Sequence, residues 1–451
     1  MNESEVLSIL TDWNYWGTFR TRHRERPDYL KRMEQLFSER SATILLGVRR
    51  SGKSSLIYLF MQQCLEKKFL DVKDTLIINF EDPRFYLPLS STELFNIYEI
   101  YIKHLDPSQP LVVLDEVQNI QGWEKFVRFL LETKKAYVMI TGSSSKLLGQ
   151  ELSTVLTGRH LDIEVFPLSY KEFLHFKDLN IIEEVDIAKH RVKIKRYLDE
   201  YAEWGGFPEV VLSTSIVRKR ELLIRYFDDI VIKDVVKRFG IKEIEKLERL
   251  ANIFISNFAT LQSFNKLKNV IATSLDTIER FSKYLQISRM FFFLKKFDYS
   301  LAKQIRSVNK IYVIDSGLYT VKGFKFSENL GRIAENIVAI ELFRKRSIMP
   351  QLEIFYWKDY QNREVDFVVK DGLQIKQLIQ ACWDVSDQPT KKRETNSLIK
   401  ASTELNCRDL LVITHDYEAT EALKWNGIER TIRFLPLWRW LLTSDTPSLL
   451  A

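Results

Sequence analysis

The sequence predicts an α/β fold built on a mostly parallel sheet, and two observations support this prediction. From residue 42 to about residue 166, short β-rich runs alternate with amphipathic helical stretches, which is typical of a parallel sheet covered by helices. A glycine-containing loop lies between the first of these runs and the helical stretch after it. The chain has 451 residues, more than one typical core holds, so we expect about two to four domains.

Composition is that of an ordinary globular protein, with 45% hydrophobic and 28% charged residues. The formal charge of +7 is compatible with nucleic-acid binding without establishing it. The first five residues are polar and acidic, unlike a signal peptide, and no apolar run approaches about 18 residues. We therefore expect a cytoplasmic protein that does not use a membrane. Three widely spaced cysteines predict neither a disulfide framework nor a zinc site.

Residues 47–54 match the phosphate-binding pattern G-x-x-x-x-G-K-[ST], with the sequence GVRRSGKS. In this pattern the backbone N–H groups of the loop point at the phosphates, Lys53 reaches the β- and γ-phosphates, and the Ser54 hydroxyl ligates Mg²⁺. The alternative is an ordinary strand-to-helix turn. The nucleotide-binding residues that we expect are Gly47, Val48, Arg49, Arg50, Ser51, Gly52, Lys53, Ser54 and Ser55.

Five strands are expected in this region, at 42–46, 75–80, 111–114, 137–141 and 161–166, with helices beginning at Lys53, Ser91, Trp123 and Ser145. The ligand of such a sheet lies at the carboxyl ends of the strands. The third strand ends in Asp115 and Glu116. Asp115 is expected to hold Mg²⁺, and Glu116 to orient and deprotonate the attacking water.

Two further candidates follow the fourth strand. Ser143 or Ser144 is expected to contact the γ-phosphate as a sensor, and a helix N-cap is the competing interpretation. Arg159 is expected to stabilise developing phosphate charge in cis or in a neighbouring subunit, or else to be a surface arginine. The N-terminal segment, with its aromatic residues and arginines before a helix at 29–37, lies beside the nucleotide base or packs on the core as an arm.

Five motifs occur in linked order: GVRRSGKS, VVLDEVQ, TGSSSKLL, GRHLDIEVFPLSYKEF and GGFPEVV. Together they resemble archaeal and bacterial ATPases of the AAA superfamily that carry a C-terminal DUF4143-type domain, and the resemblance covers nearly the whole chain. It implies an AAA-type P-loop core, a winged-helix segment, and a C-terminal α/β domain similar to PD-(D/E)xK nucleases. It also implies that the nucleotide is ATP.

The pattern after the core predicts a helical lid at 167–240, interrupted at Gly205 and Gly206, and then a winged helix at 241–320. The winged-helix prediction rests on helices at 244–258, 263–270 and 274–285, the last capped by Ser274, and on strands at 290–297 and 310–314. The recognition helix would be 275–284. The residues expected to contact phosphate from the wing are Lys295, Lys296, Lys303, Arg306 and Lys310.

The charged residues of the recognition helix do not decide whether the partner is DNA or a protein. Asp276 and Glu279 stand beside Arg280 and Lys283, so the helix is hardly a strongly cationic face. Winged helices also dock proteins. The expected partners are therefore double-stranded DNA or a protein, and an oligomer is compatible with the sequence.

In the last segment, 321–451, Glu335 on a helix and Asp366 on a strand stand where nucleases of this outline bind metal. The next strand, expected at 377–383, places Gln380 where an acid belongs and Cys382 where a lysine belongs; the alternative register keeps Lys376 but also lacks the acid. A neutral amide binds a hard cation poorly. We therefore expect a nuclease-like domain without nuclease activity.

The combined prediction is a Mg²⁺-dependent ATPase with a core and N-terminal arm at 1–166, a lid at 167–240, a winged helix at 241–320 and a nuclease-like domain at 321–451. It couples ATP hydrolysis to DNA or protein binding. The alternatives are a nucleotide-gated switch with little turnover and an ATP-regulated nuclease.

Overall fold

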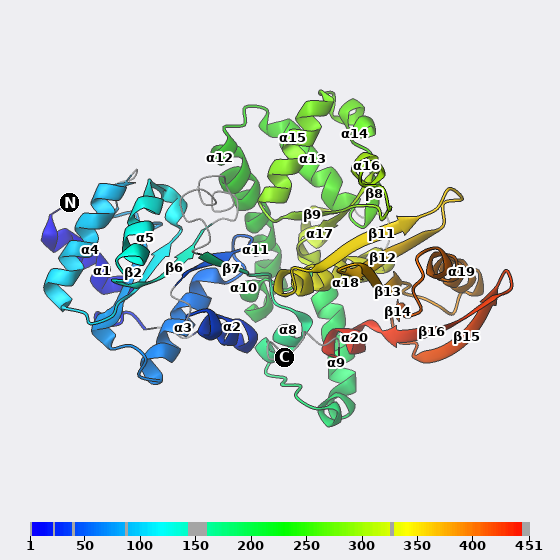
Figure 1. Cartoon of the computed structure of the whole chain (residues 1–451), viewed down its shortest axis with the longest axis horizontal. Helices are drawn as coiled ribbons and strands as arrows, with labels where there is room; N and C mark the ends of the chain where they lie inside the picture. Colours follow the sequence, from blue (N-terminus) through cyan, green and yellow to red (C-terminus); the bar gives the residue numbers. More distant parts are fainter. Residues whose placement is uncertain are drawn as a thin grey trace. The chain divides into compact units, whose positions relative to one another are not determined.

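The computed structural model describes residues 2–20, 23–37, 41–85, 89–142, 160–324 and 329–443 (Figure 1). Internal contacts divide the chain into two compact units, residues 1–165 and 166–451. No helix in the described ranges has both the length and the apolar composition needed to span a bilayer.

The first unit is built on a five-stranded parallel sheet, as predicted. Its strands are β1 (Ala42–Leu46), β2 (Thr75–Asn79), β4 (Leu111–Asp115), β6 (Tyr137–Thr141) and β7 (His160–Glu164), in the spatial order β2-β4-β6-β1-β7. Every neighbouring pair is parallel. Since β4, β6 and β1 are adjacent, their carboxyl ends meet at one edge, where a ligand of such a sheet binds.

The predicted helices follow these strands: α3 (Lys53–Glu66), α4 (Ser91–Leu105) and α5 (Trp123–Glu132). The helix expected from Ser145 lies outside the described residues. Two more helices, α1 (Glu3–Trp13) and α2 (Pro27–Phe37), precede the sheet. Short elements complete the unit: η1 (Val72–Asp74), η2 (Val117–Asn119), and the parallel pair β3 (Leu89–Ser90) and β5 (Ile120–Gln121).

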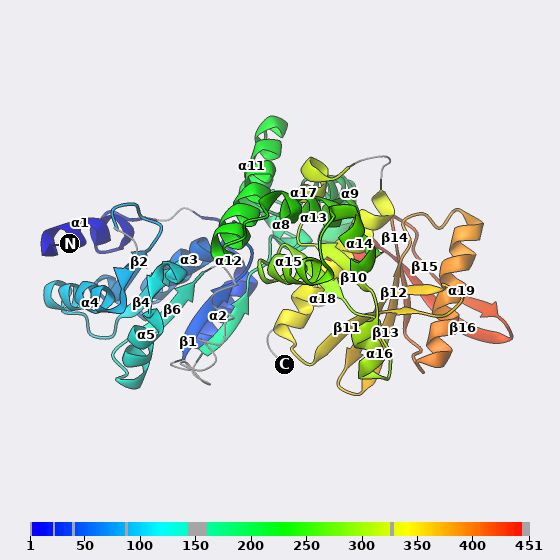
Figure 2. The same cartoon turned by 90° about the horizontal axis from the view of Figure 1, so that it is seen from above.

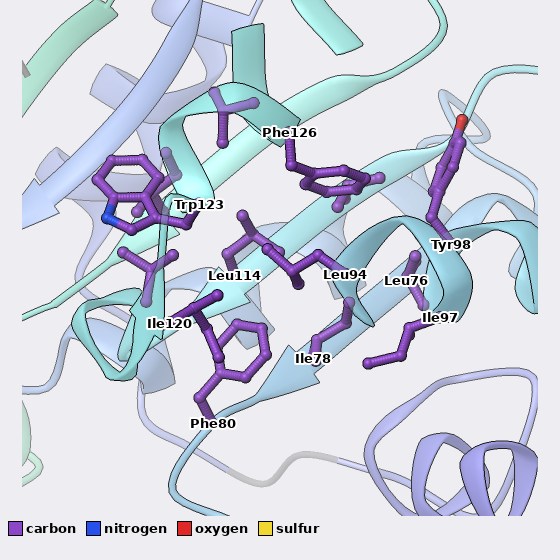
Figure 3. Packing of buried hydrophobic residues seen from close by; sticks show 14 of the residues in the cluster. Leu76, Ile78, Phe80, Leu94, Ile97, Tyr98, Leu114, Ile120, Trp123 and Phe126 are labelled. Carbon is purple, nitrogen blue, oxygen red and sulfur yellow. The ribbon is translucent and has the colours of Figure 1, made fainter. Parts of the chain in front are cut away.

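Buried side chains cover both faces of this sheet because successive residues of a strand point to opposite sides. Leu76, Ile78 and Leu114 lie in one cluster with residues of α1, α4 and α5, and Figure 3 shows Phe126 and Leu94 beside them. Ile77 and Val113, one position away, lie in the other cluster with residues of α2 and α3. The N-terminal segment therefore packs on both faces of the core, as one of its two interpretations expected.

The second unit begins with helices: α8 (Tyr170–Phe176), α9 (Glu184–Trp204), α10 (Pro208–Leu212) and α11 (Ile216–Asp229). The last continues without a break through a π-helical stretch, η3 (Ile230–Val236), into α12 (Lys237–Phe239), and Figure 2 shows α11 as a long rod. The charge pattern of the sequence predicts a helix at 217–239, and this continuous helix confirms that prediction.

The predicted interruption after α9 is a tightly packed corner. Gly205 has φ +73°, and a Cβ there would lie 1.7 Å from Asp315 Oδ1. The buried Asp315 carboxylate accepts hydrogen bonds from Gly206 N at 2.7 Å and Gly317 N at 2.9 Å. A Cβ on Gly206 would lie 2.4 Å from the Leu168 carbonyl oxygen. Both glycines are required because backbone and carboxylate approach them too closely for a side chain.

Three helices follow: α13 (Ile244–Ser256), α14 (Phe264–Ile271) and α15 (Leu275–Ile287). Ser274 caps α15, as predicted, by accepting a hydrogen bond from Thr277 N at 3.1 Å. An antiparallel sheet in the order β8-β10-β9 accompanies them, formed by β8 (Thr260–Gln262), β9 (Phe291–Leu294) and β10 (Asn309–Val313). β8, which is only three residues long, was not predicted. The short helix α16 (Leu301–Arg306), between β9 and β10, was not predicted either.

The last part holds a mixed six-stranded sheet in the order β11-β12-β13-β14-β16-β15. Its strands are β11 (Leu352–Lys358), β12 (Glu364–Asp371), β13 (Gln374–Ala381), β14 (Leu410–Thr414), β15 (Ala419–Trp425) and β16 (Ile428–Pro436). The helices of this part are α17 (Ser316–Lys322), α18 (Leu330–Ile348), α19 (Gln388–Glu404) and α20 (Leu437–Thr443). β13 starts and ends earlier than expected, so Cys382 lies just beyond the strand.

Candidate functional site

The loop between β1 and α3 has the backbone that a phosphate cradle needs. Gly47 has φ +154° and Gly52, the N-cap of α3, has φ +97°, values that favour glycine. A Cβ on Gly47 would lie 2.2 Å from the Val165 carbonyl oxygen. Arg50 also has a positive φ, +69°. The loop thus curls tightly and delivers the chain into the N-terminus of α3, where backbone N–H groups attract anions.

Polar groups of the loop are held close together. The buried Lys53 ammonium donates to the Gly47 and Val48 carbonyls at 3.1 and 3.2 Å. Ser51 Oγ is buried and has no hydrogen-bond partner among the described residues. The buried Arg26 guanidinium donates to the Ser51 carbonyl at 3.0 Å. The arm before the sheet therefore contacts the loop directly, in addition to packing on the core.

The remaining loop residues differ in exposure. Arg49 pairs with Glu81 at 2.7 Å, Arg50 is exposed, and Ser54 and Ser55 are half-buried at the start of α3. All nine expected loop positions are described. They lie in one short segment.

Asp115, at the end of β4, faces the loop across the sheet edge. Ser54 Oγ donates to Asp115 Oδ1 at 2.9 Å, and the Tyr58 hydroxyl donates to Asp115 Oδ2 at 3.2 Å. Thr141 Oγ1 also donates to Asp115 Oδ1. The two residues expected to hold the metal are therefore in direct contact. Burial, and after it the charge of Glu116, raises the pKa of the Asp115 carboxyl to about 6.

Glu116 follows in a left-handed conformation, with φ +56°. For a non-glycine residue this conformation stores strain, which is common at functional sites. Its backbone N–H donates to Thr141 Oγ1 at 3.0 Å, and its carboxylate accepts from Gln118 Nε2. The strained turn and these two contacts fix the position of the Glu116 carboxylate.

Thr141 is a functional candidate that was not predicted from the sequence. It ends β6 and joins Asp115 to the backbone of Glu116 through one hydroxyl. The signal in the sequence is a hydroxyl at the carboxyl end of a strand, immediately before the segment that contains Ser143 and Ser144. Ser143, Ser144 and Arg159 lie outside the described residues.

These groups fit a magnesium nucleotide. The Ser54 hydroxyl and the Asp115 carboxylate are hard oxygen donors. The Ser51 hydroxyl is buried in the loop with its hydrogen-bonding capacity unused by the described residues. The curled loop, the lysine and the helix N-terminus supply positive potential for phosphates.

The C-terminal acids occupy a different centre, in the second unit. Glu335 on α18 and Asp366 on β12 are both buried, and both contact Lys310 from β10. The expectation that Lys310 contacts phosphate from the wing is therefore wrong, because its side chain is buried within an ionic cluster. Lys303 and Arg306, on α16, are exposed.

Gln380 and Cys382 do not supply a metal-binding acid and a lysine. Gln380 Oε1 accepts from Asp366 N at 3.2 Å, and its Nε2 donates to Glu394 Oε2 at 2.9 Å. Burial raises the pKa of the Cys382 thiol to about 12. Within the described ranges, no three His, Cys, Asp or Glu side chains could hold a metal ion in the arrangement that the structure shows.

Three family matches cover most of the chain. An AAA domain matches residues 39–174, a domain of unknown function (DUF8612) matches residues 195–327, and a domain of unknown function (DUF4143) matches residues 330–428. The first match contains the loop, Asp115, Glu116 and Thr141.

Related proteins extend over nearly the same length. The uncharacterized protein MJ1544 of Methanocaldococcus jannaschii is 36% identical over 407 residues, which are 89% of this chain and 88% of that protein. An uncharacterized protein of Haemophilus influenzae is 28% identical over 411 residues, 90% of this chain and 96% of its own. Among solved structures, a Walker-type ATPase of Pyrococcus abyssi has a TM-score of 0.41 at 14% identity, covering 68% of this chain and 99% of its own.

Proposed function

We propose, from the premise that this chain belongs to the AAA-type ATPases with a C-terminal DUF4143 domain, that it hydrolyses ATP with Mg²⁺ and couples hydrolysis to binding of DNA or a protein. The observation that carries the proposal is the contact of Ser54 Oγ with Asp115 Oδ1 at 2.9 Å, beside Glu116. A loop that only connects a strand to a helix has no need for a hydroxyl and a carboxylate placed side by side at the start of the helix.

Each residue has a separate role in the proposed reaction. Lys53 and the backbone of residues 47–54 bind the phosphates, while Ser54 and Asp115 hold Mg²⁺. Bound Mg²⁺ would neutralise charge on the phosphate oxygens. Glu116 takes a proton from the attacking water. Thr141 fixes the position of the Asp115 carboxylate relative to the backbone of Glu116, because its hydroxyl bonds to both.

Three residues outside the described ranges also have roles in the proposed reaction. Ser143 or Ser144 senses the γ-phosphate, and Arg159 supplies positive charge as the phosphate charge develops, in cis or from a neighbouring subunit. We also propose four domains, with boundaries at 166/167, 240/241 and 320/321. In this division, residues 241–320 form a winged helix that carries the DNA or protein contact.

Steady-state ATP hydrolysis by wild type and Glu116→Gln, each with and without double-stranded DNA, tests the proposal. We expect the substitution to lower turnover roughly 100-fold or more, because it removes the general base. ATP binding should persist, since Lys53 and the loop are unchanged. Binding is measured separately, by titration with a fluorescent ATP analogue.

Glu99→Gln is the matched control, because Glu99 is an exposed carboxylate on α4. Its turnover should equal that of wild type. Turnover of Glu116→Gln within a few-fold of wild type would exclude Glu116 as the base. Stimulation of the wild type by DNA would identify DNA as the coupled partner, and its absence would favour a protein.

One observation favours a second candidate, a nucleotide-gated switch with little turnover. The Glu116 carboxylate accepts a hydrogen bond from Gln118 Nε2 within the same turn, and in a switch this contact would hold the base away from the attacking water. Gln118→Ala separates the two candidates. A switch predicts a several-fold rise in basal turnover, whereas a constitutive ATPase predicts unchanged or lower turnover.

A further inference from the structure

A single ammonium group lies among three carboxylates in the second unit. Lys310 Nζ, on β10, is 2.7 Å from Glu335 Oε1, 2.7 Å from Glu364 Oε1 and 2.8 Å from Asp366 Oδ1. Only 4% of the Lys310 side chain is exposed. The three acids come from α18 and β12, so one cation joins three elements that are far apart in sequence.

Each carboxylate is oriented toward this cation by another contact. The Tyr312 hydroxyl donates to Glu335 Oε1 at 2.7 Å, and Ala381 N donates to Asp366 Oδ2 at 3.0 Å. Lys358, on β11, donates to the outer oxygen Glu364 Oε2 at 3.3 Å. The centre is therefore built for a positive charge at the position of Lys310 Nζ.

The strand that carries Lys310 is firmly attached to the acids. The buried Asn336 side chain, next to Glu335, accepts from Val313 N and donates to Val313 O, both at 2.9 Å. This pair of hydrogen bonds attaches α18 to β10. It therefore fixes the position of Lys310, on β10, relative to Glu335, on α18.

The charge of the lysine stabilises the buried acids around it. A buried carboxylate group without a counter-charge is strongly destabilising. Burial alone would lower the pKa of Lys310, but Asp366 and Glu335 raise it well above its ordinary value. Burial, and then the charge of Asp366, raises the pKa of the Glu335 carboxyl to about 8.

We propose that Glu335, Glu364 and Asp366 form a cation site whose resident cation is the Lys310 ammonium, and that this ammonium excludes divalent metal ions from the site. The oxygens stand 2.7–2.8 Å from the nitrogen, whereas Mg²⁺ needs oxygens at about 2.0–2.1 Å. The domain is then assembled around an internal lysine where a metal-dependent enzyme would hold its ion. This inference does not depend on the ATPase proposal.

Lys310→Ala in the full-length chain tests this inference by thermal unfolding without nucleotide, with and without MnCl₂. The substitution leaves the buried Glu335 and Asp366 carboxyl groups without their cation, and Glu364 with Lys358 alone, so we expect the Tm to fall by roughly 5–10 °C. MnCl₂ should then raise the Tm of Lys310→Ala by about 3 °C or more, because the ion replaces the ammonium. Wild type should show no comparable rise.

Two control variants make the result specific. Lys358→Ala removes the lysine that contacts the rim of the same cluster, and MnCl₂ should not stabilise it more than wild type. The double variant Lys310→Ala/Asp366→Asn should lose the stabilisation by MnCl₂. Equal stabilisation of Lys310→Ala and wild type, or stabilisation that survives in the double variant, would overturn the proposal.

A second measurement does not require Lys310→Ala to fold. Mn²⁺ binding to nucleotide-free wild type and to Asp366→Asn is compared by electron paramagnetic resonance. We expect the same number of bound ions in both proteins, because Lys310 already fills the site. Loss of a Mn²⁺ site in Asp366→Asn would show that the wild-type centre holds a metal, and the proposal would be wrong.

Discussion

At the scale of single residues, Thr141 shows how one hydroxyl can organise a site. It bonds to the metal-binding candidate Asp115 and to the backbone of the candidate base Glu116. Groups that orient a metal-binding residue without touching the substrate commonly matter almost as much as the ligand itself. Thr141 is therefore a positioning residue of the proposed reaction.

Thr141→Val removes the hydroxyl and nearly preserves the side-chain shape. We expect ATP turnover or Mg²⁺ affinity to fall roughly 10- to 100-fold. Turnover is measured as a function of Mg²⁺ concentration, so that a loss of affinity is separated from a loss of maximal rate. Thr92→Val, at an exposed threonine of α4, is the control. Wild-type behaviour of Thr141→Val at every Mg²⁺ concentration would contradict the positioning role.

Asp315 predicts a pH dependence of stability. Burial raises the pKa of its carboxyl from an ordinary value of 3.8 to about 7. Between about pH 4 and pH 7 the folded state therefore binds a proton that the unfolded state has released, and this group makes stability fall as pH rises through that window. Above pH 7 its contribution is constant.

Urea unfolding of wild type and Asp315→Asn at pH 5 and pH 8 tests this expectation. The wild type should lose about 2–3 kcal/mol more than the variant between the two pH values. The absolute stability of the variant is not the readout, because an amide cannot accept both hydrogen bonds in the same way. Equal losses in the two proteins would show that Asp315 does not titrate in this range.

At the scale of elements, the corner after α9 depends on Gly205. Its φ of +73° and ψ of −164° lie in a region populated essentially by glycine, and its position against Asp315 leaves no room for a Cβ. The junction between α9 and α10 is therefore fixed by both conformation and packing.

Gly205→Ala should destabilise the protein by about 1–3 kcal/mol for the backbone conformation and a further ~1–3 kcal/mol for the clash. Gly240→Ala is the matched control, because Gly240 has φ +60° but a Cβ added there would meet nothing within 4 Å. It should lose only about 1–2 kcal/mol. Chemical denaturation measures both, and similar losses would mean that the contact with Asp315 contributes nothing.

The strands of the first sheet could be predicted because they are buried apolar runs bounded by polar loops. β1 and β6 have the predicted bounds, and the other three differ by one or two residues. β8 could not be predicted, since three half-buried residues show no periodicity. The loop, Asp115 and Glu116 follow from local motifs. Thr141 contacts Asp115, 26 positions away in the sequence, and Lys310 contacts Asp366, 56 positions away. A local sequence pattern does not reveal contacts over such separations.

At the scale of the whole molecule, the charge of +7 is compatible with both DNA and protein partners. The exposed face of α15 mixes Asp276 and Glu279 with Arg280 and Lys283. The exposed Lys303 and Arg306 of α16 stand next to exposed apolar residues, Leu301 and Ile305. Phosphate contact through α16 is therefore the form of DNA binding that we propose to test.

Lys303→Ala/Arg306→Ala should weaken DNA binding and reduce the slope of log K against log salt by about 1.8, or roughly 0.9 for each lost phosphate contact. Lys125→Ala/Lys134→Ala removes the same charge from exposed positions of the first unit and should leave the slope unchanged. Binding is measured by fluorescence anisotropy at several salt concentrations. Identical slopes for both variants would remove α16 from the DNA-binding surface.

The position of β1 between β6 and β7 has a consequence for synthesis of the chain on the ribosome. Leu46 O accepts a hydrogen bond from Val165 N at 2.6 Å, so the loop after β1 depends on a segment made more than a hundred residues later. At about 5–20 residues per second, the ribosome needs roughly 6–24 seconds to pass from β1 to β7. During that interval a nascent chain already displays the complete GVRRSGKS sequence, yet β1 first lacks both of its neighbours and then, once β6 is made, still lacks β7. Under the proposed function, we therefore expect the loop to bind nucleotide only after β7 has left the exit tunnel.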